Sequence, residues 1–182
     1  MIKQLWNFKH CDKDGNVIDE WSQYNALADE GEEAMLDVFY RAATAPTTFY
    51  CRLFNDTPAE TDAISDLTGE ASGGGYAAEE IERSATGFPT LALDSGDFQL
   101  TSKTVTFTAT TGFGPVTYAC LTTSTDSSGL LIAYVALSTS RTLAASEAPG
   151  HIAGQRAHPG IRGADPGAGE GRGRRRQPCR HD

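Results

Sequence analysis

Clustered carboxylates are the side chains of this sequence whose type and spacing could do chemistry. Two carboxyl groups held at a fixed separation across a groove can act as acid and nucleophile in the hydrolysis of a glycoside. The sequence has 24 acidic residues in 182, so such pairs arise by chance, and we assign no catalytic residue. A glycan hydrolase is kept as an alternative, with these candidate carboxylates: Glu79, Glu80, Glu82, Asp94 and Asp97.

Histidine chemistry has less support. A Ser-His-Asp triad needs a histidine that the fold can hold in place. Three of the four histidines lie in a C-terminal segment that is poor in large apolar residues: His151, His158 and His181. His10 alone is left, and we predict no triad.

The acidic run at residues 12–16 resembles the start of a calcium loop. An EF-hand needs glycine at its sixth loop position and glutamate at its twelfth. Counted from Asp12, those positions hold Val17 and Gln23. We therefore predict a plain hairpin turn, no metal site and no cofactor.

A second loop signal is the glycine run at residues 73–75. A phosphate-binding loop would continue with Lys-Ser or Lys-Thr, and this run continues with Tyr76. Glycine permits close backbone contact and unusual backbone angles. The run therefore predicts close backbone packing or a sharp entry into a strand.

The four cysteines form no Cys-x-x-Cys pair, so neither a zinc ribbon nor a thioredoxin-type redox site is predicted. Cys51 and Cys120 lie within apolar strand patterns. We expect buried thiols in a reducing compartment, and a Cys51–Cys120 disulfide between facing strands is left open. The N-terminus lacks an apolar signal region, and no apolar run is long enough to cross a membrane, which favours assembly in a cytoplasm.

Charge divides the sequence in two. Residues 1–147 carry 8 lysines and arginines against 21 acidic residues, a net charge of −13, whereas residues 148–182 carry +4. An acidic body repels phosphate backbones and anionic membranes, so a charged partner should be basic. The arginine run at residues 171–176 would suit a nucleic-acid arm, but we do not expect nucleic-acid binding.

The elements that would position these residues are mainly strands. Strands at 3–9 and 17–23 flank an Asp14-Gly15 turn signal and predict an N-terminal hairpin. Apolar residues at helical spacing predict a helix over 25–42, which Gly31 disfavours by about 1 kcal/mol relative to alanine. Alternation predicts a hairpin over 101–122, paired with strands at 47–54 and 130–137. The apolar flanks of residues 94–97 predict a further turn, and the polar loop 55–70 is long enough to be functional or to lie at an interface.

We therefore predict a mainly β protein, in which an antiparallel β-sandwich follows an N-terminal β-hairpin and one α-helix and precedes a disordered C-terminal tail. The domain limits are 1–45 for docking and oligomerisation, 46–147 for the sandwich and 148–182 for the tail. The tail holds almost no aromatic or β-branched residues. Its composition is that of GC-rich DNA read out of frame, and we hypothesise a frameshift after about residue 147.

Short motifs over about residues 24–146 resemble small structural proteins of tailed-bacteriophage virions, often labelled tail-fibre or minor structural proteins. They are Asn25 to Glu32, Pro46 to Tyr50, Gly73 to Ala77, Ser102 to Phe107, and Gly112 to Tyr118. Phe113 stands where such sequences commonly have tryptophan. They usually end in one more strand after a turn like Leu143 to Glu147, and this sequence departs there.

The resemblance implies a non-enzymatic, oligomeric virion part, at the tail fibre, baseplate, neck or capsid surface. Its partners would be other virion proteins and copies of itself. The alternative from a different class is a sandwich that binds carbohydrate or a host receptor by stacking exposed aromatic rings, with candidates Tyr76, Phe88, Phe113 and Tyr118. The candidate interface residues for assembly are Trp6, Trp21, Met35, Phe39, Tyr76 and Phe113.

Overall fold

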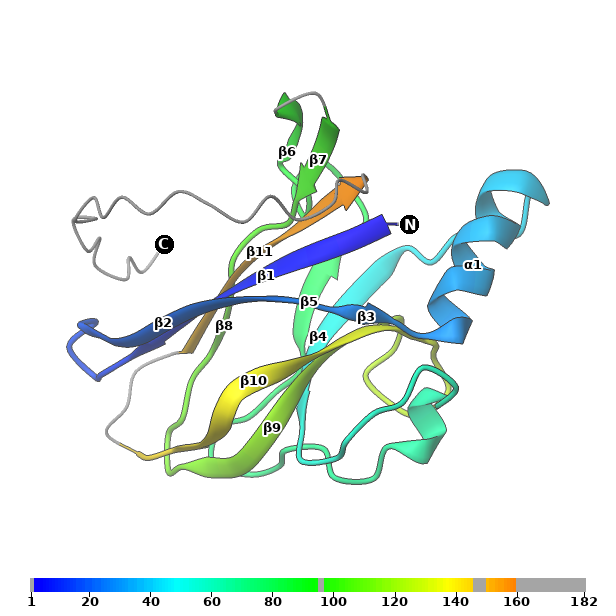
Figure 1. Ribbon diagram of the computed structural model, residues 1–182. Helices are drawn as coiled ribbons and strands as arrows, with labels where there is room; N and C mark the ends of the chain where they lie inside the picture. Colours follow the sequence, from blue (N-terminus) through cyan, green and yellow to red (C-terminus); the bar gives the residue numbers. More distant parts are fainter. Residues whose placement is uncertain (1, 95–96, 146–149, 160–182) are drawn as a thin grey trace, which may run out of the picture.

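Two antiparallel sheets form the body of the protein (Figure 1). The computed structural model describes residues 2–94, 97–145 and 150–159. Sheet A has the strand order β2 (Val17–Tyr24), β1 (Ile2–Cys11), β11 (Gly150–Pro159), β7 (Asp97–Thr101), β6 (Thr90–Asp94), with β8 (Val105–Phe107) paired to β11. Sheet B has the order β3 (Ala26–Leu27), β10 (Leu131–Leu143), β9 (Phe113–Thr122), β4 (Thr48–Phe54), β5 (Glu79–Glu82). The predicted mainly β, antiparallel class with one helix is confirmed.

The core lies between the two sheets and follows from alternation along the strands. Trp6 and Phe8 of β1 and Phe107 of β8 face inward from sheet A. Leu53 of β4 and Val116 of β9 belong to the same buried cluster from sheet B. Residues from both sheets therefore share one apolar layer, as in a β-sandwich.

The N-terminal hairpin is confirmed, and it is built into the sandwich. β1 and β2 pair antiparallel, and β1 also pairs with β11 inside sheet A. Asp12 organises the turn, because its Oδ1 accepts the backbone N–H groups of Asp14 (2.9 Å) and Asn16 (2.8 Å). The acidic run thus serves the turn that we predicted.

Helix α1 (Asp29–Tyr40) is shorter than the predicted 25–42 because residues 26–27 pair with β10 as β3. Gly31, which we expected to weaken the helix, is required by packing. A Cβ atom at this position would lie 2.1 Å from the backbone oxygen of Ile132. The helix can lie against β10 only because residue 31 has no side chain.

The segment 101–122 does not form the predicted hairpin. β8 pairs with β11 in sheet A, whereas β9 pairs with β10 and β4 in sheet B. The residues between them carry the chain from one sheet to the other, and the alternation in each strand is the same for both arrangements. The predicted pairing of this region with 130–137 and 47–54 is confirmed for β9.

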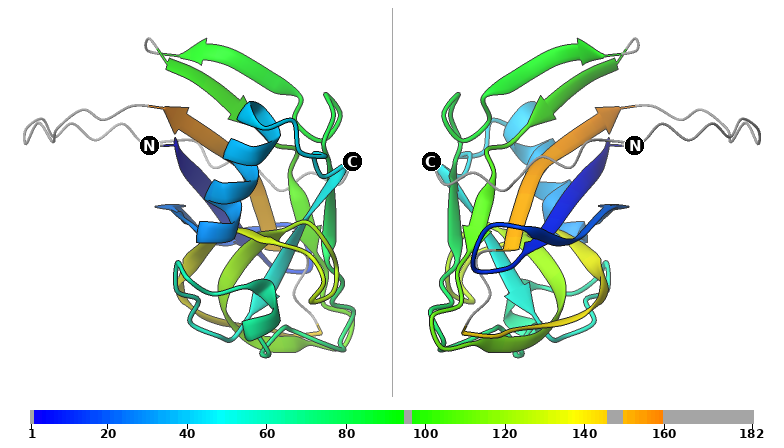
Figure 2. Two further views of the ribbon diagram at one scale, coloured as in Figure 1. Left: turned by 90° about the vertical axis from the view of Figure 1, so that its right-hand side faces the viewer. Right: turned by 90° about the vertical axis from the view of Figure 1, so that its left-hand side faces the viewer.

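The predicted disordered tail does not hold for residues 150–159, which form β11 between β1 and the β7 and β8 strands (Figure 2). Backbone pairing on both sides supplies what the composition of this segment lacks, since strand formation depends strongly on context. The sandwich therefore has the final strand that we expected to be replaced. Residues 160–182 lie outside the described residues. The frameshift hypothesis stays a prediction, which sequencing of the encoding DNA would test.

The long loop 55–70 covers the outer face of sheet B. Ile64, in the short helix η1 (Ile64–Asp66), is buried against Phe54, Cys120 and Leu131, and Leu67 packs beside them. This second apolar layer explains why β4 and β10 carry apolar residues on both faces. We expected this loop to be functional or to lie at an interface; in the structure it covers the protein's own sheet.

Cys51 and Cys120 are free and buried, so the open disulfide alternative is wrong. Cys51 pairs with Leu121 across the sheet, and Cys120 pairs with Arg52. Neighbouring residues on a strand point to opposite faces. Cys51 therefore belongs to the inner core and Cys120 to the outer layer, and the sheet separates their thiols.

Candidate docking surfaces

A buried network of hydrogen bonds ties several loops to strand β4 of sheet B. The guanidinium of Arg52, which is 4% exposed, donates to both carboxylate oxygens of Glu70, with Nε to Oε1 at 2.8 Å. The Tyr76 hydroxyl donates to Glu70 (2.9 Å) and accepts the backbone N–H of Leu53 (3.0 Å). Arg52 also donates to the backbone oxygen of Asp126 (2.9 Å). One network therefore joins β4, the loop 55–70, the glycine run and the β9–β10 connection.

The glycine run packs closely against the crossing between β8 and β9, as predicted. Gly74 has a φ of 57°, and a Cβ there would lie 1.9 Å from the backbone oxygen of Gly112. The backbone oxygen of Gly74 accepts the N–H of Thr110 (2.6 Å). These contacts bring Tyr76 to the Arg52–Glu70 pair.

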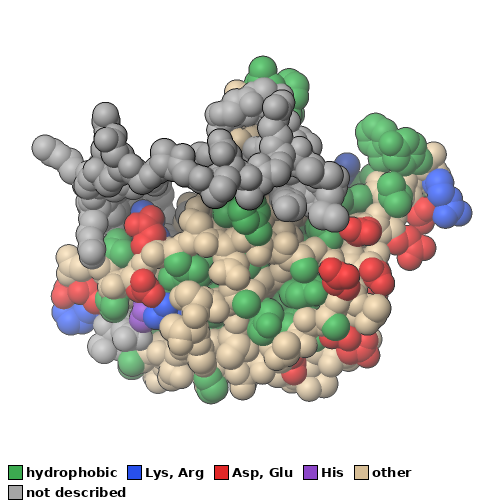
Figure 3. Space-filling view, in the orientation of Figure 1, with side chains coloured by type: hydrophobic (Ala, Val, Ile, Leu, Met, Phe, Trp, Pro, Cys, Tyr) green, Lys and Arg blue, Asp and Glu red, His purple; other side chains and the backbone are tan. Residues whose placement is uncertain are grey.

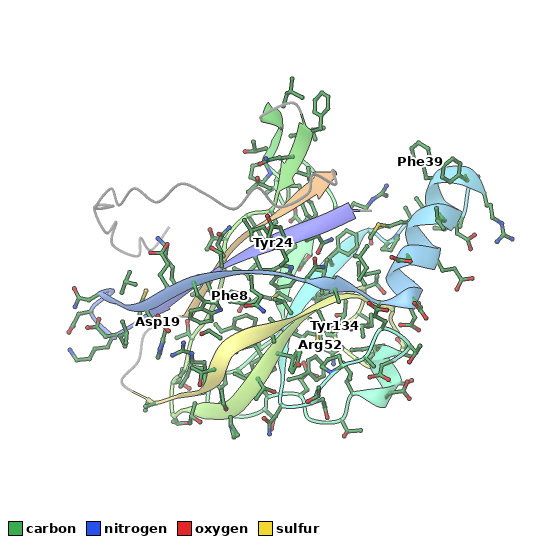
Figure 4. All side chains as sticks on the ribbon, viewed as in Figure 1. Phe8, Asp19, Tyr24, Phe39, Arg52 and Tyr134 are labelled. Atoms are coloured by element: carbon green, nitrogen blue, oxygen red, sulfur yellow. The ribbon has the colours of Figure 1, made fainter. Side chains whose placement is uncertain are left out.

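Arg141 of β10 joins the two sheets at the β2 edge. It forms an ion pair with Asp19 of β2, and its guanidinium carbon lies 4.6 Å from the ring centroid of Trp21. Trp21 in turn stacks on Phe8, with ring centroids 5.0 Å apart. Figure 4 shows Phe8 and Asp19 at this end of the sandwich. The Trp21 ring is therefore in contact with Arg141 and Phe8 of the same chain.

The end of α1 exposes three large apolar side chains, which we call the α1 patch. Leu36, Phe39 and Tyr40 are 58%, 80% and 75% exposed. The first part of the helix packs on β10 through Gly31, and Met35 packs against the main core cluster, whereas the last turn extends past the sheets. Figure 4 shows Phe39 at this outer end, pointing away from the body. In Figure 3 hydrophobic side chains gather at the same end, beside acidic ones.

A second exposed apolar surface lies on the β6–β7 hairpin, which we call the ribbon. Leu91, Leu93 and Phe98 are 68%, 63% and 60% exposed. The hairpin rises above the rest of the molecule in both views of Figure 2. The sequence indicated the turn at 94–97, but it did not indicate that the apolar side chains on either side of the turn are exposed. Their alternation is the same for a strand against a core and for a strand in water.

The six predicted interface residues do not form one surface. Trp6 and Phe113 are 0% and 4% exposed, so the prediction does not hold for them: both rings fill the protein's own core. Three more of the six are half-buried and pack against the core: Trp21, Met35 and Tyr76. Phe39 is the one member of the six that lies on the surface. Sequence reasoning missed Leu36 and Tyr40, its neighbours in the α1 patch.

The aromatic residues considered for carbohydrate stacking make internal contacts. Tyr76 stacks on Phe107 at 5.8 Å, and Phe113 meets Tyr76 edge-on at 5.4 Å. Phe88 lies edge-on to Phe49, with centroids 6.0 Å apart. The Tyr118 ring lies 6.4 Å from that of Tyr134. In the structure each of these four rings packs against another ring of the same chain.

The candidate carboxylates are spread over both sheets. Glu79, Glu80 and Glu82 lie on β5 of sheet B, whereas Asp94 and Asp97 pair at the tip of the ribbon in sheet A. Burial raises the pKa of Glu79, and Lys103 opposes that rise. Glu80 and Glu82 are exposed. A cleft at one end of the sandwich, lined by Phe8, Trp21, Phe107 and Arg141 among others, contains none of the five.

Other candidate sites are also missing from the residues that the structure describes. Within residues 2–94, 97–145 and 150–159 there is no group of histidine, cysteine and acidic residues that could hold a metal ion. In the same ranges no helix has the length and apolar character needed to cross a membrane. His151 and His158 lie on β11, and their side chains, like the arginine run at 171–176, lie outside what is described.

Residues 26–156 match the model of the family described as podophage GP4 fiber I protein gp80. The chain belongs to this family. The matched range takes in α1, all the strands of sheet B, and the strands of sheet A other than β1, β2 and the end of β11, so the resemblance continues past about residue 146, where we placed its end. No curated protein and no solved structure gave a match. Membership makes the chain a structural component of a tailed-phage virion, of the tail-fibre type, which interacts with other virion components.

Proposed function

We propose that this chain is a non-enzymatic fibre subunit that attaches to a neighbouring virion protein through the α1 patch, with assembly in the host cytoplasm. The observation that carries the proposal is the exposure of Phe39, 80%, at the outer end of a helix whose other end is held firmly. Exposed large aromatic side chains are rare on surfaces that meet only water and are enriched at the centre of interfaces.

The base of α1 is fixed to the body by hydrogen bonds from one side chain and from the backbone. The Glu30 carboxylate accepts the N–H of Leu131 at 2.7 Å. The N–H of Asp29 donates to the backbone oxygen of Glu60 (2.8 Å), and that of Ala28 donates to Ile132 (3.2 Å). A helix held in this way presents its last turn already ordered, so docking loses little conformational entropy.

The partner that fits is an apolar pocket with a basic rim. The α1 patch is flanked by acidic residues, including Glu33 and Asp37 on the same helix. The cation at its end, Arg41, is already paired with Asp37 at 2.8 Å. A rim of lysine and arginine would complement this charge, and docking should weaken as salt is raised.

Binding of the purified full chain to virions that lack it tests the proposal. We expect the wild type to co-sediment with such particles and Phe39→Ser to bind at least about tenfold more weakly, since a buried aromatic anchor carries much of an interface. Ile18→Ser is the matched control, because Ile18 is also exposed, 52%, but lies on β2. Equal binding by wild type and Phe39→Ser would overturn the proposal.

A further inference from the structure

Cys11, the last residue of strand β1, is disulfide-bonded and completely buried. Cys51 and Cys120 are both free thiols. The sequence has four cysteines, and the remaining one is Cys179, near the C-terminus. Elimination therefore leaves Cys179 as the partner of Cys11 within one chain.

We propose that a Cys11–Cys179 disulfide fastens the C-terminal segment of this chain to the β1–β2 hairpin. The bond is open in the reducing cytoplasm of the host and closes after release from the cell, because disulfides persist only in oxidising surroundings. It depends only on the residues that the chain carries, so it holds whichever reading frame encodes residues 148–182. It is also independent of docking through the α1 patch, which lies on another element.

The C-terminal segment is long enough to return to Cys11. β11 lies beside β1, with Pro159 paired to Ile2, and Cys11 stands at the opposite end of β1 (Figure 1). Nine residue steps separate Ile2 from Cys11, which is about 30 Å of strand. The 20 residue steps from Pro159 to Cys179 can span up to about 70 Å. The segment can therefore cover the length of β1 more than once.

Charge favours the approach of the two ends. Residues 10–20 carry four acidic side chains against one lysine, whereas residues 171–180 carry five arginines and no acidic residue. The guanidinium group pairs well with carboxylates. Because both segments belong to one chain, this attraction acts at a high effective concentration and brings Cys179 to the hairpin.

The bond forms by thiol–disulfide exchange with a small disulfide outside the cell, such as oxidised glutathione. Arginines on both sides of Cys179 favour its thiolate, which is the attacking species. Cys179 displaces one small thiol and becomes a mixed disulfide, and the sulfur of Cys11 then displaces the second thiol. The two cysteines lose two electrons and two protons, and the small disulfide is reduced to two thiols.

Tryptic mapping without reduction tests the bond in the full chain. After treatment with oxidised glutathione and blocking of free thiols, we expect peptides 10–13 and 177–180 to be joined and to separate on reduction. In cells lysed directly into denaturant with iodoacetamide, both peptides should carry the alkyl group. A bond already present in such cells would contradict closure after release. Cys11 alkylated in the oxidised chain, or joined to Cys51, Cys120 or another copy, would overturn the proposal.

Closure on the hairpin should also stabilise the folded protein. The bond closes a loop of about 170 residues in the unfolded chain, but only the last 20 or so after Pro159 in the folded one. Oxidation should therefore raise the thermal midpoint by about 4–8 °C. Cys179→Ser should lose this rise, whereas the matched control Gln177→Ser should keep it. Equal midpoints for the oxidised and reduced wild type would contradict closure on the folded hairpin.

Discussion

Arg52 and Glu70 form a two-bond ion pair between strand β4 of sheet B and the end of the long loop, with the Arg52 side chain 5% exposed and that of Glu70 27% exposed. Because the guanidinium is buried, its charge depends on this partner. The pair also receives the Tyr76 hydroxyl. The position of the loop that covers sheet B is thus tied to one carboxylate.

Glu70→Gln should destabilise the protein by about 2–4 kcal/mol, because it leaves a buried arginine without a counter-charge. Urea unfolding near neutral pH measures the change. Arg41→Gln is the control, since the Arg41–Asp37 pair is an exposed i,i+4 contact and should cost about 0.5 kcal/mol at most. Similar losses in the two variants would mean that burial of Arg52 does not have the energetic role assigned to it.

Tyr76→Phe should cost about 1–3 kcal/mol near neutral pH, because the Leu53 N–H and Glu70 lose a hydrogen-bond partner. Burial raises the pKa of the Tyr76 hydroxyl well above its ordinary 10.0. Its contribution to stability is therefore complete below pH 10 and lost as the pH rises further, because the unfolded chain ionises first. The free-energy difference between wild type and variant should narrow above about pH 10. A difference that is constant with pH would contradict the raised pKa.

Gly31→Ala should destabilise the protein by about 1–3 kcal/mol through overpacking against the Ile132 carbonyl. Helix propensity alone predicts the opposite, a gain of about 1 kcal/mol. Glu32→Ala, on the exposed side of the same turn, is the comparison and should be nearly neutral. Thermal unfolding distinguishes the two expectations, and a more stable Gly31→Ala would show that α1 does not lie as close to β10 as described.

The thiols of Cys51 and Cys120 should resist alkylation in the folded protein. Burial raises the pKa of both, which disfavours the reactive thiolate. Mass spectrometry of peptides after iodoacetamide treatment should find these two cysteines modified only when the protein is unfolded first. Rapid modification of either in the native state would show that the inner core or the outer layer opens readily.

Local signals predicted the local elements. The Asp14-Gly15 turn placed the β1–β2 hairpin, apolar residues at helical spacing placed α1, and the strand predicted at 47–54 is β4. The glycine run was correctly interpreted as close packing. Each of these features depends on residues near one another in sequence.

What the sequence did not show depends on long-range pairing. The alternation in 101–122 is the same whether β8 and β9 pair with each other or lie in different sheets. β11 forms because β1, β7 and β8 offer backbone groups on its two sides, which its own composition does not reveal. Exposure of Phe39, and burial of Trp6 and Phe113, follow from where α1 ends and where the sheets meet. The candidate docking surfaces therefore became visible only in the fold.

Cryo-electron microscopy of the intact virion tests the central claim most directly, because it locates the subunit and its contacts together. We predict that the sandwich fits density in a tail fibre, with the Phe39 end of α1 inserted into a pocket of a neighbouring protein. Absence of the chain from purified virions, or a fibre subunit whose α1 patch faces solvent, would contradict this account.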